Sequence, residues 1–294
     1  MSVVCGAARP GGAHLSPAER VPAHGRGVGR VLPGDEDAVE FLRHGSLEVQ
    51  GRLVEASNAT LLCDIRHDGV EAECVYKPVR GERPLWDFPD GTLAGREVAS
   101  FLLAEAMGWH VVPPTVLRDG PFGPGMVQLW VDTEEGSELV DLVPPSSVPE
   151  GWCPVLRAQD HRGESVVLAH ADHADLRKLA VLDVVINNAD RKGGHILHTP
   201  RGEVLGVDHG VSLNCEDKLR TVLWGWIGRS LDAEETDRLG ALRAALEGSV
   251  AAELAEHISA KEVGAVASRV ERLLGDGALP APSAEWPAIP WPAF

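Results

Sequence analysis

The chain has 294 residues, is 44% hydrophobic and carries a formal net charge of −17, and this length and apolar content suffice for one large domain or two closely associated lobes. The acidic charge argues against a nucleic-acid partner, and because no run of about eighteen apolar residues occurs, the sequence predicts no membrane span. The five cysteines are scattered without a C-x-x-C pair, which argues against a zinc ribbon or a disulfide scaffold, and with no visible signal peptide we expect a cytoplasmic protein.

The first predicted elements are a tail and an antiparallel meander. Residues 1–34 are rich in Gly, Pro, Ala and Arg and show no hydrophobic periodicity, so we expect them to be disordered. Over residues 47–80, short apolar runs alternate with turns, and His67-Asp68-Gly69 supplies a hairpin turn. This pattern predicts sheet rather than alternating strands and helices.

One helix and two further strands complete the β-rich half. Residues 92–107 show the spacing of an amphipathic helix that Thr92 caps and Gly108 ends. Residues 111–112 begin a strand that two prolines interrupt, and residues 126–131 form a short buried strand.

Helices dominate the second half. Residues 136–170 are Pro-rich, and we expect them to be irregular. Residues 172–187 predict a long, mostly buried helix. The polar cluster at its start, residues 170–175, could bind a metal, but its position before an apolar helix favours capping by Asp172. A short hairpin follows over residues 196–207.

The remaining elements are two amphipathic helices, at residues 232–258 and 260–274, and a tail that carries Trp286 and Trp291. The whole order predicts an α+β fold with two lobes, a β-rich N-lobe with one main helix and a mostly helical C-lobe. We therefore divide the chain into a disordered Gly/Pro/Arg tail, an N-lobe with the ATP-binding sheet, a C-lobe with the catalytic and metal-binding segments, and a Pro/Trp-rich tail: residues 1–34, 35–131, 132–275 and 276–294.

Two polar segments interrupt the apolar pattern of the second half. Residues 187–197 end the buried helix and contain Asp190, and residues 206–210 end the next strand and contain Asp208. Phosphoryl transfer needs one carboxylate that orients the nucleophile and another that holds the metal. Either aspartate alone would be interpreted as a surface turn or cap, whereas the pair around a short hairpin indicates one phosphoryl-transfer cleft.

These segments read Asn-x-Asp-Arg and then Val-Asp-x-Gly, and they resemble the catalytic and metal-binding segments of the phosphatidylinositol 3-/4-kinase-like family. The resemblance is nearest to the type II 4-kinase branch and to an actinobacterial branch identified by that similarity, and HipA-like and secretory-pathway kinases show similar segments. It covers roughly residues 47–230. It implies a two-lobed protein-kinase-like fold that binds ATP with a divalent metal.

The resemblance also implies roles for the residues that match these motifs. Asp190 is similar to the catalytic base or nucleophile-orienting carboxylate, and Arg191 to its structural or phosphate-contacting neighbour. Asp208 is similar to the metal-binding aspartate of the D-x-G segment, in which Gly210 lets the chain turn sharply.

Lys77 and Glu97 extend the resemblance upstream. Lys77 ends an apolar strand and resembles the lysine that contacts the ATP phosphates, while Glu97, near the start of the following helix, resembles its acidic partner. Alone, the lysine would be a solvated strand end and the glutamate a solvated helix face. The two residues therefore form a single hypothesis.

Two weaker segments take the places of the phosphate-covering loop and the hinge. The turn before the second strand of the meander has no glycine, so Ser57 and Asn58 would contact the nucleotide through hydroxyl and amide groups; a plain hairpin turn is an equal alternative. Backbone groups of Trp130 and Val131 would meet the adenine, although Trp130 is alternatively a core residue.

His195 departs from the family pattern, which usually has Asn as a second metal ligand at this place. Imidazole suits Mn²⁺ or Zn²⁺ better than Mg²⁺, which prefers oxygen. We predict Asp208 and His195 as ligands of Mg²⁺ or Mn²⁺. The histidine then implies one of three outcomes: one metal site is lost, the metal preference is altered, or His195 contacts a phosphate instead.

The sequence therefore supports an ATP-dependent phosphotransferase whose acceptor is a protein or a small molecule. An acidic chain with only Lys218 and Arg220 as cations after the D-x-G segment suits a phosphorylated inositol headgroup poorly. A nucleotide-binding pseudokinase that acts as a regulatory module is the alternative, favoured by His195 and the glycine-free loop. The same parts also permit nucleotidyl transfer, and a structural adaptor whose Pro/Trp tail recruits partners is a third interpretation.

Overall fold

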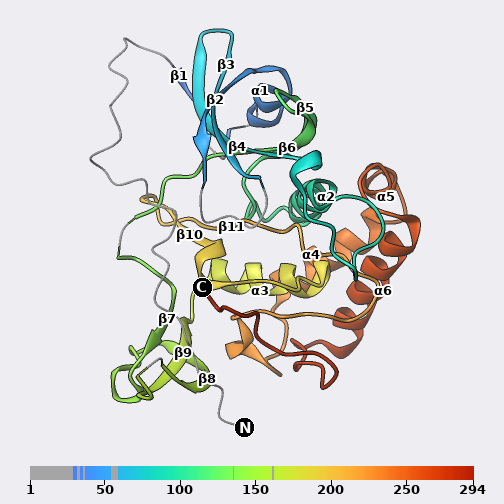
Figure 1. Ribbon diagram of the computed structural model, residues 1–294. Helices are drawn as coiled ribbons and strands as arrows, with labels where there is room; N and C mark the ends of the chain where they lie inside the picture. The colour runs from blue at the N-terminus through green and yellow to red at the C-terminus, as the bar shows by residue number, and fades with distance from the viewer. Residues whose placement is uncertain (1–28, 32–33, 36, 54–58, 135, 161) are drawn as a thin grey trace.

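The computed structural model describes residues 29–31, 34–35, 37–53, 59–134, 136–160 and 162–294. A β-rich N-terminal part lies above a mainly helical C-terminal part (Figure 1), which confirms the predicted α+β class. Most of the predicted tail, residues 1–28, lies outside the described residues.

One mixed sheet forms the N-terminal part. Its main path runs in the order β2-β3-β4-β6-β5 with antiparallel neighbours, and β1 pairs with β4 in parallel. The strands are β1 (Gly29–Arg30), β2 (Ser46–Arg52), β3 (Leu61–His67), β4 (Val70–Pro78), β5 (Thr115–Gly120) and β6 (Gly123–Leu129). Asp68 and Gly69 turn the β3–β4 hairpin with φ values of 48° and 77°, which suits the expected two-residue turn.

The two faces of this sheet are covered by helices α1 (Ala38–His44) and α2 (Leu93–Ala106). Phe41 of α1 packs in one core cluster with Tyr76 of β4, whereas Val98 of α2 packs in another with Met126 of β6. Side chains alternate along a strand, so Lys77, next to Tyr76, points to the α2 side. Because side chains alternate along β4, this lysine faces the helix that carries Glu97.

Helix α2 agrees with its prediction at both ends. The Thr92 side chain accepts a hydrogen bond from the Gly95 amide, and Gly108 follows the helix with a φ of 65°. The predicted strand at residues 111–112 is wrong, because β5 begins only at Thr115. The two prolines in between have no N–H for a strand ladder.

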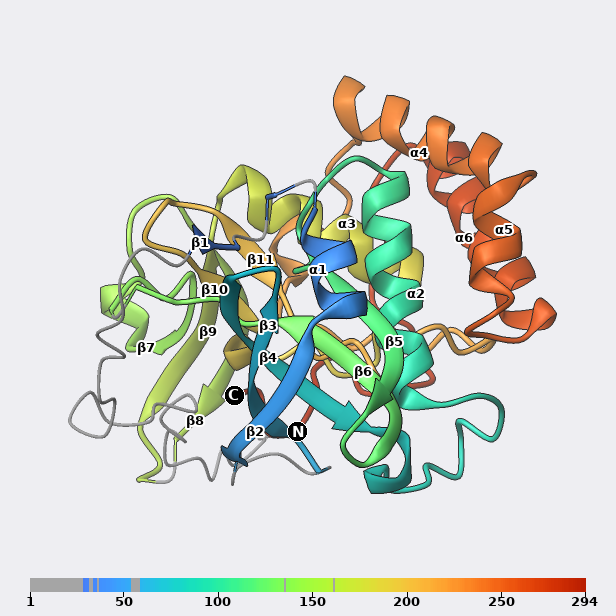
Figure 2. The same cartoon turned by 90° about the horizontal axis from the view of Figure 1, so that it is seen from above.

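Helix α3 (Ala174–Ile186) lies in the main core of the C-terminal part. The helices beside it gather at one end of the molecule (Figure 2): α4 (Ala233–Ala245), α5 (Ser249–Leu254) and α6 (Ala260–Asp276). The helix predicted over residues 232–258 is therefore two helices. Gly248, a poor helix former, lies immediately before α5.

A second, three-stranded antiparallel sheet replaces the irregular segment predicted over residues 136–170. Its order is β7-β9-β8, with β7 (Val140–Val143), β8 (Trp152–Gln159) and β9 (Ser165–Ala171). The prediction failed because Pro154 interrupts the strand pattern of β8. The structure accommodates this proline next to a register shift between Pro154 and Leu156.

The start of α3 also differs from its prediction. His173, not Asp172, is the N-cap, and its side chain accepts a hydrogen bond from the Asp175 amide. Asp172 instead accepts hydrogen bonds from Trp226 Nε1 at 2.7 Å and Arg229 Nη1 at 2.9 Å. After α3, the predicted hairpin is confirmed as β10 (Ile196–His198) and β11 (Val204–Gly206).

The C-terminal tail packs on its own chain. The Ala288 carbonyl accepts hydrogen bonds from the Thr221 amide at 3.1 Å and from Trp224 Nε1 at 2.8 Å. The Ala293 carbonyl accepts one from the Gly193 amide at 2.8 Å. Among the described residues, no helix has both the length and the apolar content needed to cross a membrane.

Candidate active site

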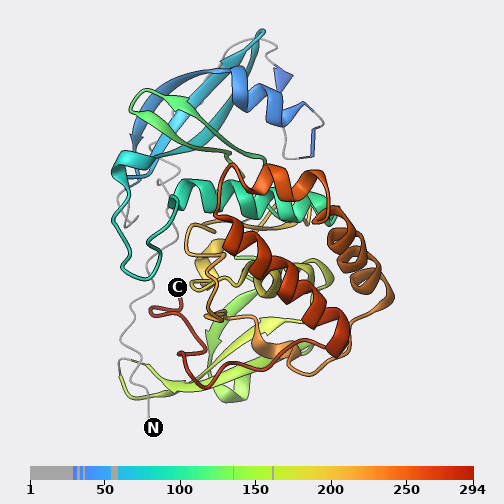
Figure 3. The ribbon, with the colours of Figure 1, turned by 90° about the vertical axis from the view of Figure 1, so that its right-hand side faces the viewer.

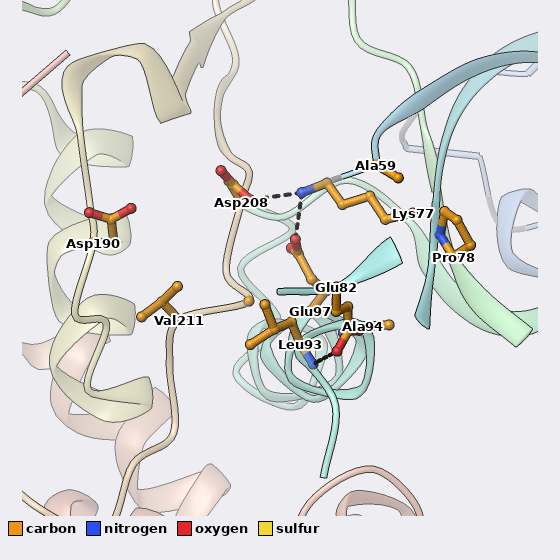
Figure 4. A pocket seen from close by; sticks show the side chains of 11 residues that line it. Ala59, Lys77, Pro78, Glu82, Leu93, Ala94, Glu97, Asp190, Asp208 and Val211 are labelled. Atoms are coloured by element: carbon orange, nitrogen blue, oxygen red, sulfur yellow. Dashed lines mark hydrogen bonds and ion pairs between the residues drawn. The ribbon is translucent and has the colours of Figure 1, made fainter. Parts of the chain in front are cut away.

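A cleft between the sheet and the C-terminal part is lined by four of the predicted site residues: Lys77, Glu97, Asp190 and Asp208. It has about 500 Å³ of empty space, part of it open to solvent. Figure 4 shows its lining: Ala59, Lys77, Pro78, Glu82, Leu93, Ala94, Glu97, Asp190, Asp208, Gly210 and Val211. Four carboxylates and one ammonium group thus line the cleft.

Lys77 connects the sheet to both other parts of the cleft. Its Nζ lies 2.7 Å from Glu97 Oε1 and 2.7 Å from Asp208 Oδ1 (Figure 4). Burial alone would lower the pKa of this ammonium, but the two carboxylates outweigh burial and raise the pKa above its usual value. Lys77 is therefore a firmly charged group held between two anions.

Glu97 is almost completely buried, with a 2% exposed side chain. One carboxylate oxygen accepts from Lys77, and the other accepts from the backbone N–H of His209 at 2.8 Å. Burial raises the pKa of Glu97, and the contact with Lys77 opposes that shift. This single side chain thus joins β4, α2 and the segment after β11.

Glu82 fixes the start of α2 at the cleft, a role that the sequence analysis did not predict. Its carboxylate accepts from the backbone N–H groups of Leu93 and Ala94, at 2.9 and 2.8 Å. N–H groups of the first helical turn have no hydrogen-bond partner within the helix, and a negative charge is favourable at this end. A glutamate eleven residues before the helix gives no local capping signal in the sequence.

Asp208 follows β11 in a left-handed conformation with a φ of 61°. Such a backbone is costly for a residue other than glycine, and it is frequent at functional sites. Its side chain is 52% exposed, and Lys77 holds the pKa of its carboxyl well below the usual range. The carboxylate is therefore ionised and accessible within the cleft.

Gly210 does not supply the sharp turn that was expected, because its φ is not positive; Asp208 and Leu213 take the left-handed conformation instead. A Cβ at Gly210 would lie 3.3 Å from the Cβ of Leu93. The glycine thus allows close approach between the segment after β11 and the start of α2.

Asp190 lines the same cleft from the loop after α3. In Figure 4, Asp208 lies between Asp190 and Lys77. Burial raises the pKa of the Asp190 carboxyl, while Lys192, whose Nζ lies 3.3 Å from it, opposes the shift. A carboxylate with a raised pKa suits the acceptance of a proton from a hydroxyl group.

Arg191 does not line the cleft, and its position favours the structural one of its two predicted roles. Its side chain is completely buried and pairs with Asp183 of α3, with Nη2 and Oδ1 2.9 Å apart. It also donates to the Val207 carbonyl at 3.0 Å and contacts His209 Nε2 at 2.6 Å. Arg191 therefore joins α3 to the strand end that carries Asp208.

Asp183 is the partner that the sequence analysis missed. Its carboxylate accepts hydrogen bonds from Asn188 Nδ2 at 2.9 Å and Thr221 Oγ1 at 3.1 Å, in addition to those from Arg191. The available signal was a single aspartate within the apolar second half of the helix. A fully buried carboxylate requires such partners.

His195 faces Asp208, with Nε2 and Oδ2 3.4 Å apart. Burial lowers the pKa of His195 to about 4, although Asp208 acts in the opposite direction, so the imidazole is neutral near pH 7. Its Nδ1 is buried without a hydrogen-bond partner in the described structure. A neutral imidazole beside a carboxylate can donate a hydrogen bond to Asp208 or bind a metal.

The donor set fits a divalent cation that is shared with a polyphosphate. Asp208 and Asp190 offer the oxygen ligands that Mg²⁺ and Mn²⁺ accept, and His195 offers a nitrogen that favours Mn²⁺. Within the described residues, no group of three or more His, Cys, Asp or Glu side chains forms a complete metal site. Phosphate oxygens or water would have to complete the coordination.

Of the four other predicted nucleotide contacts, the structure describes two. Ser57 and Asn58 lie outside the described residues. Neither Trp130 nor Val131 lines the cleft, and the Trp130 amide donates to the Glu73 carbonyl at 3.0 Å. The adenine contact of these residues stays a prediction.

The chain is similar in sequence to a protein of Mycobacterium tuberculosis and more distantly in structure to two kinases. No protein-family model matches the chain. Among solved structures, the Golgi casein kinase is 14% identical with a TM-score of 0.48 and covers 82% of this chain and 73% of its own. The Helicobacter pylori proinflammatory kinase CtkA is 9% identical with a TM-score of 0.37 and covers 79% of this chain and 97% of its own. Protein Rv2133c of Mycobacterium tuberculosis is 51% identical over 277 residues, which cover 91% of this chain and 99% of that protein.

Proposed function

From the premise that this chain belongs to the same family as protein Rv2133c of Mycobacterium tuberculosis, we propose that it is an ATP-dependent phosphotransferase of the cytoplasm. The observation that carries the proposal is the ammonium of Lys77, which lies 2.7 Å from both Glu97 and Asp208 in a cleft that Asp190 also lines. The resemblance of the segments around Asp190 and Asp208 to phosphatidylinositol 3-/4-kinases supports the same chemistry. In this proposal residues 35–131 act as the N-lobe and residues 132–275 as the C-lobe.

Each side chain then has one task. Lys77 binds phosphate oxygens of ATP, and buried Glu97 keeps the lysine oriented. Asp208 holds the metal, which when bound neutralises charge on the phosphates. Asp190 orients the acceptor hydroxyl and receives its proton, a role that its raised pKa favours.

A metal is required on electrostatic grounds. The four carboxylates of the lining outnumber its one ammonium, so metal-free ATP meets a net negative cleft. A divalent cation held by Asp208 reverses this repulsion for the nucleotide phosphates. We assign Mg²⁺ or Mn²⁺ to this position and expect His195 to favour Mn²⁺.

A protein or small-molecule acceptor fits better than a phosphoinositide. The net charge of −17 repels anionic lipid surfaces. Lys218, one of the two cations of the segment after the cleft, is already ion-paired with Asp87 at 3.1 Å and Glu216 at 3.3 Å. Its side chain is only 4% exposed, which leaves it unsuited to binding a headgroup.

A nucleotide-binding pseudokinase is the second candidate, because of one specific observation. The neutral imidazole of His195 stands beside Asp208, where the family usually has an amide oxygen. Such a site would bind the nucleotide without efficient transfer. Buried Glu97 and cleft-lining Asp190 favour the enzyme over this alternative.

The test is ADP formation and label transfer from ATP labelled on the γ-phosphate, with each metal, in the presence of protein extracts and of hydroxylated small molecules. We expect transfer by the wild type and a loss of at least about 100-fold in Asp190→Asn, with ATP binding retained. Asp217→Asn is the matched control, because its carboxylate pairs with Arg272 outside the cleft. ATP binding without transfer to any acceptor would favour the pseudokinase, and equal transfer by Asp190→Asn would remove Asp190 from the mechanism.

A further inference from the structure

Helix α2 carries two adjacent buried charges that serve different parts of the molecule. Glu97 contacts Lys77 in the cleft, and Arg96, 1% exposed, points away from that contact into the C-terminal part. In Figure 3, α2 lies beneath the sheet with the helices of the C-terminal part beside it. The position of Glu97 thus depends on how α2 is anchored.

Arg96 anchors α2 at three points. Its guanidinium pairs with Glu262 of α6 at 2.5 Å and donates to the Ser212 carbonyl and the Asp90 carbonyl, both at 2.9 Å. Ser212 follows the segment that contains Asp208. One side chain therefore connects α2 to α6 and to the chain just after the candidate metal ligand.

Glu262 is itself fixed by the start of α6. It is the third residue of α6 and forms a capping box with the N-cap residue Ser259. Its Oε2 accepts hydrogen bonds from the Ser259 amide and the Ser259 hydroxyl, both at 2.8 Å. Its other oxygen faces Arg96. The carboxylate is thus held by a helix terminus before it contacts α2, which leaves little freedom to the pair.

The backbone of α2 also lies close to the chain that precedes α6. A Cβ at Gly95 would lie 2.7 Å from the His257 carbonyl oxygen, too near for any side chain. Gly95 is next to Arg96, so the close contact and the ion pair act on the same helical turn. Together they oppose sliding or rotation of α2 relative to the C-terminal part.

We infer that the Arg96–Glu262 pair is a positioning device that holds α2 so that Glu97 remains on Lys77 and His209. The inference rests on the proposed function for its consequence, because the group thereby positioned is the phosphate-binding lysine. In this chain the position of Glu97 in the nucleotide-binding arrangement then depends on α6, a helix far along the sequence. Arg96 and Glu262 do not line the cleft, so they act only by positioning Glu97.

The chain offers a closely matched control pair. Glu235 is the third residue of α4 and forms a capping box with the N-cap residue Asp232. Its carboxylate contacts Arg177 of α3 at 2.6 and 2.9 Å. Its side chain is 4% exposed, close to the 6% of Glu262. Both pairs therefore join a capping-box glutamate to an arginine of an earlier helix, but only one of them lies on α2.

The test compares Glu262→Gln with Glu235→Gln in the full chain. The first measurement is the rate at which an amine-acylating reagent modifies Lys77 at one fixed pH, followed by mass spectrometry with a lysine peptide as internal reference. We expect Glu262→Gln to raise this rate at least about threefold, because release of Glu97 leaves the amine with one carboxylate partner fewer. Glu235→Gln should leave the rate unchanged even if it lowers thermal stability equally.

The second measurement is the dissociation constant of ATP with Mn²⁺ or Mg²⁺. We expect it to rise about tenfold in Glu262→Gln and to stay within about twofold in Glu235→Gln. If Lys77 reactivity changes but no variant binds ATP, the positioning role holds and the proposed function fails. If Lys77 reactivity is equal in both variants and the wild type, the positioning role is overturned. Should Glu262→Gln not fold, Glu262→Asp, which keeps the charge but shortens the reach, is measured in the same way.

Discussion

At the scale of single residues, Asp208 concentrates the features of a functional group. Its backbone is left-handed, its carboxylate is half exposed, and its two oxygens face Lys77 and His195. A position chosen for stability alone would favour glycine at this φ. These features support the proposal that Asp208 binds the metal, and in this proposal His195 sets the metal preference.

The first prediction concerns His195→Asn. Because its neutral imidazole offers nitrogen where Mg²⁺ prefers oxygen, the wild type should bind ATP more tightly with Mn²⁺ than with Mg²⁺. An amide oxygen should shift that preference towards Mg²⁺ by about tenfold, as measured by titration calorimetry with each metal. His110→Asn, at an exposed position, is the control. An unaltered metal preference in His195→Asn would exclude His195 from the metal site.

The sequence predicted which charged residues meet, but not how deeply they are buried. Lys77, Glu97, Asp190 and Asp208 share one cleft, as expected from the motif order. The same pattern left two roles open for Arg191, because a sequence specifies a charge and not its exposure. The complete burial of Arg191 against Asp183 favours the structural role.

At the scale of elements, the second sheet contacts the C-terminal core through His170 of β9. Its Nδ1 lies 2.9 Å from the Ala171 carbonyl, and its Nε2 accepts from the Gly225 amide at 3.0 Å. The ring packs against that of Trp226, with centroids 4.2 Å apart and the ring planes tilted by 42°. These contacts require a neutral imidazole, since protonated Nε2 cannot accept a hydrogen bond.

The second prediction is a pH dependence of stability that arises at His170. Burial lowers the pKa of His170 below its ordinary value of about 6.5, so between the two values the unfolded chain binds more protons. The free energy of unfolding should therefore fall as the pH falls below about 6.5. His170→Gln should reduce that slope by up to about 1.4 kcal/mol per pH unit in urea titrations.

His195, His209 and His257, whose pKa values are also lowered mainly by partial or complete burial, should contribute with the same sign and keep part of the slope in the variant. The same slope in His170→Gln and wild type would show that protonation of this ring does not affect unfolding.

The elements that were predicted correctly carry strong local signals. Thr92 before α2 and the Asp68-Gly69 turn act through neighbouring backbone groups, which a sequence window contains. The second sheet was missed because Pro154 in β8 and the bulge beside it break the alternation on which strand prediction depends. Pairing with β9 compensates, and that contact is not local.

At the scale of the whole molecule, the C-terminal tail closes over the loop that carries Asp190. The Gly193 amide, three residues after Asp190, donates to the Ala293 carbonyl. A Cβ at Gly193 would collide with the ring of Phe294. The sequence indicated only a Pro-rich tail, because a contact between segments so far apart has no local pattern.

The third prediction follows from this packing. Removal of residues 286–294 deletes three hydrogen bonds, two to the Ala288 carbonyl and one to the Ala293 carbonyl. At about 1 kcal/mol each, their loss should lower the free energy of unfolding by about 3 kcal/mol, before any loss of apolar packing. Hydrogen exchange should become faster at Gly193 in particular, as measured by mass spectrometry on the segment after α3.

Phe294→Ala, which keeps both carbonyl acceptors and their three hydrogen bonds, should have a smaller effect on both quantities. If the truncated chain keeps its stability and its exchange rates, the tail does not support the Asp190 loop. That result would favour the interpretation of the tail as a segment that recruits partners.

The measurement that tests the central claim most directly is thermal stabilisation by ATP with Mg²⁺, with Mn²⁺ and without metal. Because four carboxylates and one lysine line the cleft, ATP should stabilise the wild type only with a metal, by about 2.7 kcal/mol at one hundred times its dissociation constant. Asp208→Ala should lose that stabilisation, whereas Asp217→Ala, outside the cleft, should keep it. No stabilisation with either metal, or equal stabilisation of Asp208→Ala, would contradict a metal-dependent nucleotide site at Lys77, Glu97 and Asp208.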